Sequence, residues 1–183
     1  MANVIWSIGV SLDGYIADAA GDFDWAAPDP ELHRFHNEQT LELGAHLIGR
    51  RLYETMLPWE TMDPSTGDVI GEFARIWQAL PKIVFSTTMS EVEGNARLAT
   101  GSIEEELARL GDAEVAVGGA GLAAELTRRG LIDEYRLFVN PVVVGGGTPF
   151  FPALDHRIGL ELLEARTFGS QVVYLRYQRE AAR

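Results

Sequence analysis

The sequence contains no cysteine, which excludes disulfides, thiolate zinc sites, iron–sulfur clusters and thiol catalysis. It is also poor in basic residues, with 15 Lys and Arg against 27 Asp and Glu and a formal net charge of -12. Because nucleic acids and anionic membranes are polyanions, we expect neither as a partner. No apolar run approaches the ~20 residues that span a bilayer, and no basic region precedes the first apolar run. We therefore expect a cytoplasmic protein.

The composition is that of an ordinary globular protein. Of the 183 residues, 46% are hydrophobic and 23% are charged. A chain of this length buries roughly 70% of the surface of its unfolded form, so it needs no cross-links. No internal repeat or low-complexity segment interrupts it. We predict a single domain over residues 1–183.

Apolar strands alternate with helical patterns through the first two thirds of the chain. Predicted strands cover residues 4–11, 45–48, 82–86 and 114–117, and predicted helices cover 30–43, 51–56, 69–80, 102–110 and a segment from Gly121 to Arg129. Asp29 is a candidate N-cap before Pro30, and Ser102 with Glu105 forms a capping-box pattern. This alternation indicates a mostly parallel sheet with helices on both faces.

The last third of the chain has a different pattern. Residues 134–144, 160–167 and 171–179 are strand-like, with little helix between them. A short Phe168-Gly169-Ser170 turn joins the last two segments, which predicts an antiparallel hairpin. The predicted fold class is therefore α/β: a mixed, mostly parallel central sheet flanked by helices, with a C-terminal antiparallel hairpin.

Gly118-Gly119-Ala120-Gly121 lies between a predicted strand and a predicted helix. In open α/β sheets, ligands bind outside the carboxyl ends of the parallel strands. Without side chains the backbone can approach a ligand closely, and the following helix start favours an anion. The segment therefore suits a phosphate or pyrophosphate. The alternative is that the glycines only permit tight packing of strand and helix.

Two further strand ends carry ligands for phosphate oxygens. Arg50 and Arg51 follow Gly49, and guanidinium groups bind phosphate bidentately. The segment Ser86-Thr87-Thr88 offers hydroxyl groups after another strand. The alternatives are a solvated basic pair and an ordinary turn. Together the three strand ends predict a phosphorylated cofactor laid across one edge of the sheet, and an arginine pair favours NADP over NAD.

Other polar residues have both a functional and a structural interpretation. Asp13 is a candidate site carboxylate, or closes a turn onto backbone amides. Tyr53 could donate a proton, but its spacing equally fits packing. His33 and His36 could form a metal site with Glu31, although a solvated or partly buried histidine pair is the better interpretation. We predict no metal site.

Several segments, taken in this order, resemble the dihydrofolate reductase superfamily. They are most similar to the reductase domain of the bifunctional riboflavin-biosynthesis deaminase–reductase and its stand-alone relatives. The segments are Ser11-Leu12-Asp13-Gly14-Tyr15-Ile16-Ala17, Gly49-Arg50-Arg51-Leu52-Tyr53-Glu54, Val84-Phe85-Ser86-Thr87-Thr88, Val117-Gly118-Gly119-Ala120-Gly121-Leu122, Gly130-Leu131-Ile132-Asp133-Glu134-Tyr135 and Pro141-Val142-Val143-Val144-Gly145-Gly146-Gly147-Thr148-Pro149. Their order and spacing cover nearly the whole chain.

The resemblance implies an NADPH-dependent reductase with a dihydrofolate reductase-like fold, and a homodimer. By this analogy the nicotinamide would lie against Ile16 and Ala17, and Trp25 would stack on it or on the substrate, or only pack the loop. The adenosine side and its extra phosphate would be held by Gly49, Arg50, Arg51, Ser86, Thr87 and Thr88. The pyrophosphate would be bound by Gly118, Gly119, Ala120, Gly121 and Leu122. The loop over residues 14–30 is a candidate lid.

The expected reaction is hydride transfer to a C=N or C=O group of a small heterocyclic or sugar-derived substrate, as in 5-amino-6-(5-phosphoribosylamino)uracil reductases. Relatives in the riboflavin pathway carry an acid where this chain has Val117, and a threonine where it has Leu52. The alternatives are a dihydrofolate or pteridine reductase, a non-catalytic NADPH-binding module and, more distantly, a metal-dependent enzyme using His33 and His36.

Overall fold

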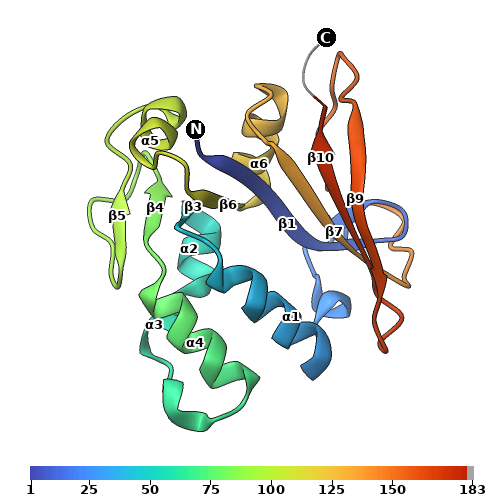
Figure 1. Cartoon of the computed structure of the whole chain (residues 1–183), viewed down its shortest axis with the longest axis horizontal. Helices are drawn as coiled ribbons and strands as arrows, with labels where there is room; N and C mark the ends of the chain where they lie inside the picture. Colours follow the sequence, from blue (N-terminus) through green and yellow to red (C-terminus); the bar gives the residue numbers. More distant parts are fainter. Residues whose placement is uncertain (181–183) are drawn as a thin grey trace. The chain divides into compact units, whose positions relative to one another are not determined.

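The computed structural model describes residues 1–180, which form two compact units. The first unit joins Met1–Val4 to His33–Leu122, and the second joins Ile5–Leu32 to the chain from Ala123 onward. Each unit has its own set of adjacent strands (Figure 1). None of the helices within residues 1–180 is long and apolar enough to cross a membrane.

The first unit contains four adjacent parallel strands. In spatial order these are β5 (Ala96–Leu98), β4 (Lys82–Phe85), β3 (Ala45–Gly49) and β6 (Glu114–Gly118). Its helical segments are most of α1 (Pro30–Leu41), α2 (Arg50–Met56), α3 (Pro58–Thr61), the 3-10 turn η2 (Pro64–Thr66), α4 (Val69–Ala79), α5 (Ile103–Arg109) and the start of α6 (Ala120–Arg128).

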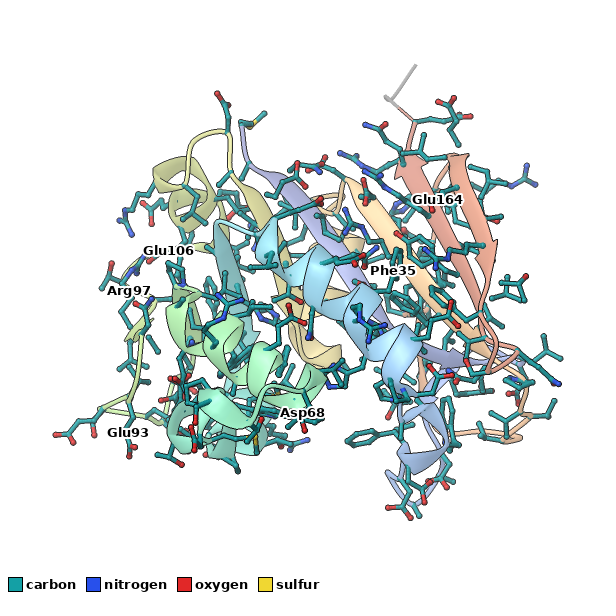
Figure 2. All side chains as sticks on the ribbon, turned by 60° about the horizontal axis from the view of Figure 1, so that its bottom comes forward. Phe35, Asp68, Glu93, Arg97, Glu106 and Glu164 are labelled. Carbon is teal, nitrogen blue, oxygen red and sulfur yellow. The ribbon has the colours of Figure 1, made fainter. Side chains whose placement is uncertain are left out.

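Helices cover both faces of these strands. Trp77 of α4 packs in one buried cluster with Val84 of β4. Glu106 of α5 binds Arg97 of β5, which lies opposite Ile83 in the strand register (Figure 2). Because Ile83 and Val84 are successive strand residues, they point to opposite faces. The two helices therefore lie on opposite faces, as the sequence predicts.

The second unit combines parallel and antiparallel pairing. In spatial order its strands are β1 (Asn3–Ser11), β7 (Glu134–Asn140), β10 (Val173–Arg179) and β9 (Leu160–Thr167). Strand β1 is parallel to β7, whereas β10 is antiparallel to both β7 and β9 (Figure 1). Two short strands, β2 (Tyr15–Ala17) and β8 (Thr148–Pro149), form a separate antiparallel pair, and η1 (Asp24–Ala26) is a 3-10 turn. The mixed, mostly parallel α/β fold with a C-terminal antiparallel hairpin is confirmed.

The helix starts follow from local chemistry. The Asp29 carboxylate accepts a hydrogen bond from the Leu32 amide at 2.8 Å, so α1 begins at Pro30 as predicted. Ser102 and Glu105 form the predicted reciprocal capping box at the start of α5. Each cap satisfies backbone donors that have no partner inside the helix.

Other boundaries differ from the sequence prediction. The strand predicted over residues 134–144 ends at Asn140, where Pro141 follows and cannot donate to a ladder. Gly147 then has a φ of 134°, and a side chain there would meet the Ala17 carbonyl oxygen at 2.1 Å. The segment is therefore a glycine-dependent turn. The helix predicted over residues 30–43 ends at Leu41, and the segment predicted as a loop over residues 14–30 contains β2 and η1.

Candidate functional site

The candidate site begins at the carboxyl ends of three neighbouring parallel strands. Strand β3 lies between β4 and β6, with Gly49 opposite Phe85 and Ile48 opposite Gly118. Parallel strands end at the same edge of a sheet. The structure therefore brings together the three strand ends that the sequence singles out, all within the first unit (Figure 1).

The glycine segment after β6 is shaped by what surrounds it. A side chain at the buried Gly118 would meet His46 Nε2 at 2.6 Å, so only glycine fits there. Gly119 has a φ of 96°, in the region that favours glycine, and a β-carbon at this position would lie 3.7 Å from the Gly49 amide nitrogen. The loops after β3 and β6 are thus in close contact.

Helix α6 begins directly after these two glycines. Ala120, Gly121 and Leu122 form its first turn, where amides have no partner inside the helix. A side chain at Gly121 would find no atom within 4 Å, so this part of the backbone faces open space. No acidic residue lies in the first turn, which leaves the positive end of the helix dipole uncompensated.

The arginine pair opens helix α2. Gly49 is the N-cap residue and offers no side-chain cap. Arg50 Nη1 lies 3.1 Å from Glu54 Oε1 in an exposed i,i+4 pair, which is worth only a few tenths of a kcal/mol. The exposed Arg51 side chain forms no hydrogen bond or ion pair with the described residues 1–180. Arg51 is therefore a cation available to an anionic ligand.

The hydroxyl segment after β4 divides into two parts. Ser86 Oγ accepts hydrogen bonds from the Thr88 amide at 3.1 Å and from the Met89 amide at 3.0 Å. Ser86 therefore closes its own turn, in agreement with the alternative that this segment is an ordinary turn. Thr87 and Thr88 have exposed side chains at the same edge. These two are the better candidates for contact with a ligand.

Tyr53 is almost completely buried, in the cluster formed with Ile48, Trp77 and Val84. Its hydroxyl donates to the Glu93 carbonyl oxygen at 3.1 Å and accepts from the Glu93 amide at 2.6 Å. Both hydrogen-bonding functions of the hydroxyl are thus used inside the protein. The contacts favour the packing role for Tyr53, and proton donation stays a prediction.

In the second unit, Asp13 binds the backbone of the glycine-rich turn over residues 144–147. Its carboxylate accepts from Ser11 Oγ at 2.7 Å, the Gly145 amide at 2.8 Å and the Val144 amide at 3.2 Å. The hydrogen bonds from Ser11 and from these amides lower the pKa of Asp13 below its ordinary value. This is the turn-closing interpretation. A catalytic role for Asp13 stays a prediction.

The residues expected near the nicotinamide also lie in the second unit. Ile16 is buried and Ala17 half-buried in β2, which pairs with β8 through Thr148. Trp25 lies in η1, and its indole Nε1 is buried with no acceptor among the described residues. Its neighbour Ala26 packs against Gly9, where a side chain would meet it at 3.0 Å. Trp25 itself is half-buried, and both its packing role and its contact with a ligand stay predictions.

Sequence reasoning missed the histidine beneath the glycine loop. His46 stacks edge-on against Trp77, with ring centroids 5.6 Å apart. Burial, followed by the nearby Lys82 charge, lowers the pKa of His46 to about 4, so it is neutral at pH 7. The available signal was one polar residue in the otherwise apolar strand 45–48. His46 supports the loop from below.

Both histidines of α1 are half-buried. Burial, followed by the charge of His33, lowers the pKa of His36 to about 4. The His33 ring packs edge-on against Phe73. Within residues 1–180 no three His, Asp or Glu side chains gather in a metal-binding arrangement.

Comparison with known proteins places this geometry in a family. The sequence pattern of the RibD C-terminal domain matches residues 2–174. The chain belongs to the RibD C-terminal domain family. The uncharacterized protein YyaP of Bacillus subtilis (strain 168) is similar to it, with 32% identity over 182 residues that cover 96% of this chain and 94% of YyaP. Membership supports a function like that of the riboflavin-pathway reductases.

Solved structures agree with the family assignment. A protein of Shewanella sp. PV-4, provisionally named for riboflavin biosynthesis, is 25% identical, with a TM-score of 0.78 and coverage of 99% of this chain and 100% of its own. The Thermotoga maritima deaminase/5-amino-6-(5-phosphoribosylamino)uracil reductase has a TM-score of 0.68 and 17% sequence identity, and the match covers 96% of this chain and 56% of that chain. Dihydrofolate reductase from Enterococcus faecalis, complexed with NADP(H), has a TM-score of 0.63 and 18% sequence identity, and the match covers 97% of this chain and 96% of that chain. These last two similarities show the dihydrofolate reductase-like fold.

Proposed function

We propose that this protein is an NADPH-dependent reductase that transfers hydride to a C=N or C=O group of a small heterocyclic or sugar-derived substrate. The arrangement at the ends of β3, β4 and β6 carries the proposal. Open backbone at Gly121, a helix start without a nearby acid, and Arg51, whose side chain has no partner within residues 1–180, lie at the same end of these strands. Anion binding at a helix start is the physical basis of phosphate recognition.

The chain's own residues suit a dinucleotide phosphate. Gly119, Ala120, Gly121 and Leu122 would hold the pyrophosphate through backbone amides, and no β-carbon obstructs the approach at Gly121. Arg51, with Thr87 and Thr88, would bind the additional phosphate that distinguishes NADPH from NADH. Once bound, the cofactor would supply the hydride, and the protein would supply binding, orientation and exclusion of water. The E. faecalis relative binds NADP(H), which supports this choice.

The substrate is proposed by chemical class. The riboflavin-pathway relatives favour an aminopyrimidine. In this chain Val117 is buried in β6 where those relatives carry an acid, so this chain must recognise its substrate without that acid. Dihydrofolate reductases hold the pterin with a carboxylate on the first long helix. In this chain Glu31, the acid near the start of α1, already accepts from the Gly169 amide at 3.2 Å and lies 3.5 Å from Arg166, so a folate is less favoured.

Titration of the protein with NADPH, followed by fluorescence, tests the first step, and consumption of NADPH tests the second. We expect saturable binding and oxidation of NADPH with a pyrimidine of the riboflavin pathway or a related small carbonyl or imine. Faster turnover of dihydrofolate would favour the pteridine alternative. Binding without oxidation across the screen would favour a non-catalytic module, and absence of NADPH binding would contradict the proposal. Activity that survives a chelator would dismiss the metal-dependent alternative.

A further inference from the structure

Strands β1 and β7 run side by side in the second unit and end together, at Ser11 and Asn140 (Figure 1). Ligands of open α/β sheets bind beyond the carboxyl ends of the parallel strands. Both residues are buried, with 1% and 5% of their surfaces exposed. The Ser11 hydroxyl is already engaged, because it donates to Asp13 Oδ1 at 2.7 Å and accepts from the Tyr15 amide at 3.0 Å. Asn140 is therefore the residue of this pair that can bind a ligand through its side chain.

The side-chain amide of Asn140 has a fixed orientation. Its Nδ2 donates to the Phe138 carbonyl oxygen at 2.9 Å and to the Val10 carbonyl oxygen at 3.4 Å. The opposite orientation would place an oxygen against both carbonyls, so Nδ2 occupies this side of the amide and Oδ1 the other. No donor within residues 1–180 reaches Oδ1, and this oxygen, unlike the indole Nε1 of Trp25, is not enclosed. A buried side chain thus presents one unused acceptor.

The surroundings of this acceptor are largely apolar. Gly9 and Phe138 lie opposite each other in the register, and both share a face of the sheet with Asn140. A β-carbon at Gly9 would meet Ala26 Cβ at 3.0 Å and Asn140 Nδ2 at 3.5 Å, so the candidate lid approaches the amide at η1. The buried Phe138 ring packs against Tyr174, with ring centroids 4.8 Å apart. An apolar surface with a few fixed polar groups is typical of a small-molecule site.

We propose that Asn140 Oδ1 selects the substrate by accepting a hydrogen bond from an amino group or a ring N–H of a heterocycle. The inference rests on the proposed reductase function and names a group that the substrate carries. A heterocycle without this donor would leave the acceptor unpaired, and sites built around a hydrogen bond reject analogues that lack the bonding group. Recognition through Asn140 does not need the acid that riboflavin-pathway relatives carry at the position of Val117.

Matched pairs of small probes test the acceptor. We would titrate the full chain, without NADPH, with 2- and 4-aminopyrimidine and with 2- and 4-methylpyrimidine, and obtain the dissociation constants by NMR. Amino and methyl groups are similar in size, but only the amino group donates. Wild type should bind at least one aminopyrimidine about tenfold more tightly than its methyl counterpart. In Asn140→Leu, which removes the acceptor and keeps the size of the side chain, the two affinities should agree within about threefold.

Further variants separate selection from folding. Asn140→Thr has a hydroxyl that can donate to the Phe138 carbonyl oxygen and still accept, so it should retain an amino preference of about threefold or more. Asn140→Ala takes the place of Asn140→Leu if thermal unfolding shows that the leucine variant does not fold. Asn95→Leu is the matched control: it removes an amide that donates to the Ala79 carbonyl oxygen at 2.7 Å, and it should leave the preference unchanged.

Titration of the same proteins with NADPH distinguishes this inference from the proposed function. A purely structural Asn140 would change the affinities for both members of a probe pair alike. Wild type without an amino preference, or a preference that survives removal of the acceptor, would overturn the role of Asn140 even where NADPH binds. Absence of NADPH binding by wild type would contradict the reductase function, whatever the probes show.

Discussion

At the scale of single residues, the fold constrains two of the three glycines at the start of α6. Gly118 has no space for a side chain because His46 Nε2 would lie 2.6 Å away. Gly119 has space but a φ of 96°, and Gly121 has neither restriction. The fold therefore requires glycine at the first two positions, whereas Gly121 is the position at which we propose that a ligand requires it.

Gly121→Ala separates binding from stability. Alanine is favoured over glycine inside a helix by up to about 1 kcal/mol, so the melting temperature should stay the same or rise. The added methyl group would enter the open space proposed for the pyrophosphate, and NADPH affinity should fall by about tenfold, or about 1.4 kcal/mol. Isothermal titration and thermal unfolding measure the two effects. Gly118→Ala is the matched control, with a lowered melting temperature, and unchanged NADPH binding by Gly121→Ala would contradict the assignment.

The roles of some residues can be predicted from hydrogen bonds to their neighbours in sequence, whereas the roles of others depend on distant contacts. Asp29 and Ser102 cap helices through amides three positions away, so the sequence alone contains both partners. The partner of the Tyr53 hydroxyl is the Glu93 backbone, forty positions along the chain. The Asp13 carboxylate likewise binds amides more than 130 positions away. Whether such a polar side chain is catalytic or structural depends on contacts that the fold creates.

At the scale of elements, β4 is joined to α3 and α4 by a buried charge. Lys82 is the only lysine of the chain, and its side chain is fully buried. Its Nζ lies 3.0 Å from Glu60 Oε1, donates to the Leu80 carbonyl oxygen at 2.9 Å, and lies 4.7 Å from the centre of the Trp77 ring. Burial lowers the pKa of Lys82, and Glu60 opposes that shift. The pair holds α3 against the strand.

Removing either member of the Lys82–Glu60 pair should lower the free energy of unfolding. Lys82→Met or Glu60→Gln each leaves a buried charge without compensation, and each should destabilise the fold by about 3 kcal/mol. The double variant should cost less than the sum, with a coupling energy above about 1 kcal/mol in denaturant unfolding. The exposed pair of Arg50 and Glu54 is the control, with coupling near 0.3–0.5 kcal/mol. Additive costs at Lys82 and Glu60 would show that the pair does not couple.

The longer elements were predictable, and the shortest were not. Strands β1, β3, β4, β6, β9 and β10 and helices α1, α4, α5 and α6 follow from hydrophobic periodicity and caps. Strands β5 and β8 have only three and two residues, and each exists because a distant segment pairs with it. Helix α3 has four residues and starts at a proline after α2. Periodicity needs more residues than these segments contain.

At the scale of the whole molecule, two histidines that are neutral in the folded protein predict how stability depends on pH. His36 and His46 have folded-state pKa values of about 4, below the ordinary 6.5. Between these values the unfolded chain binds more protons, so stability should fall as pH falls from 6.5 towards 4. Glu106 extends the loss of stability to lower pH. The hydrogen bond from Arg97 lowers the pKa of Glu106 to about 2, so stability should fall further as pH falls from 4.5 towards 2.

Melting temperatures measured from pH 8 to pH 2.5 check this dependence. The profile should be nearly flat above pH 6.5 with respect to these groups and should decline below it. In a His36→Gln/His46→Gln variant the decline should begin nearer pH 4.5, where Glu106 starts to lose its charge in the unfolded chain. A wild-type melting temperature that stays constant from pH 7 to pH 4.5 would contradict the assignment of two histidines that stay neutral in the folded protein.

The proposed function depends most on an anion site at the ends of three parallel strands, and cofactor preference tests this site directly. We would measure dissociation constants for NADPH and NADH with wild type, the Arg50→Ala/Arg51→Ala variant and Arg75→Ala, which removes an exposed arginine of α4. The double variant should weaken NADPH binding by about 100-fold, since a hydrogen bond to a charged group contributes about 1.5–3 kcal/mol. NADH binding should weaken by less than about threefold, and Arg75→Ala should change neither. Equal losses for the two cofactors would contradict the central claim.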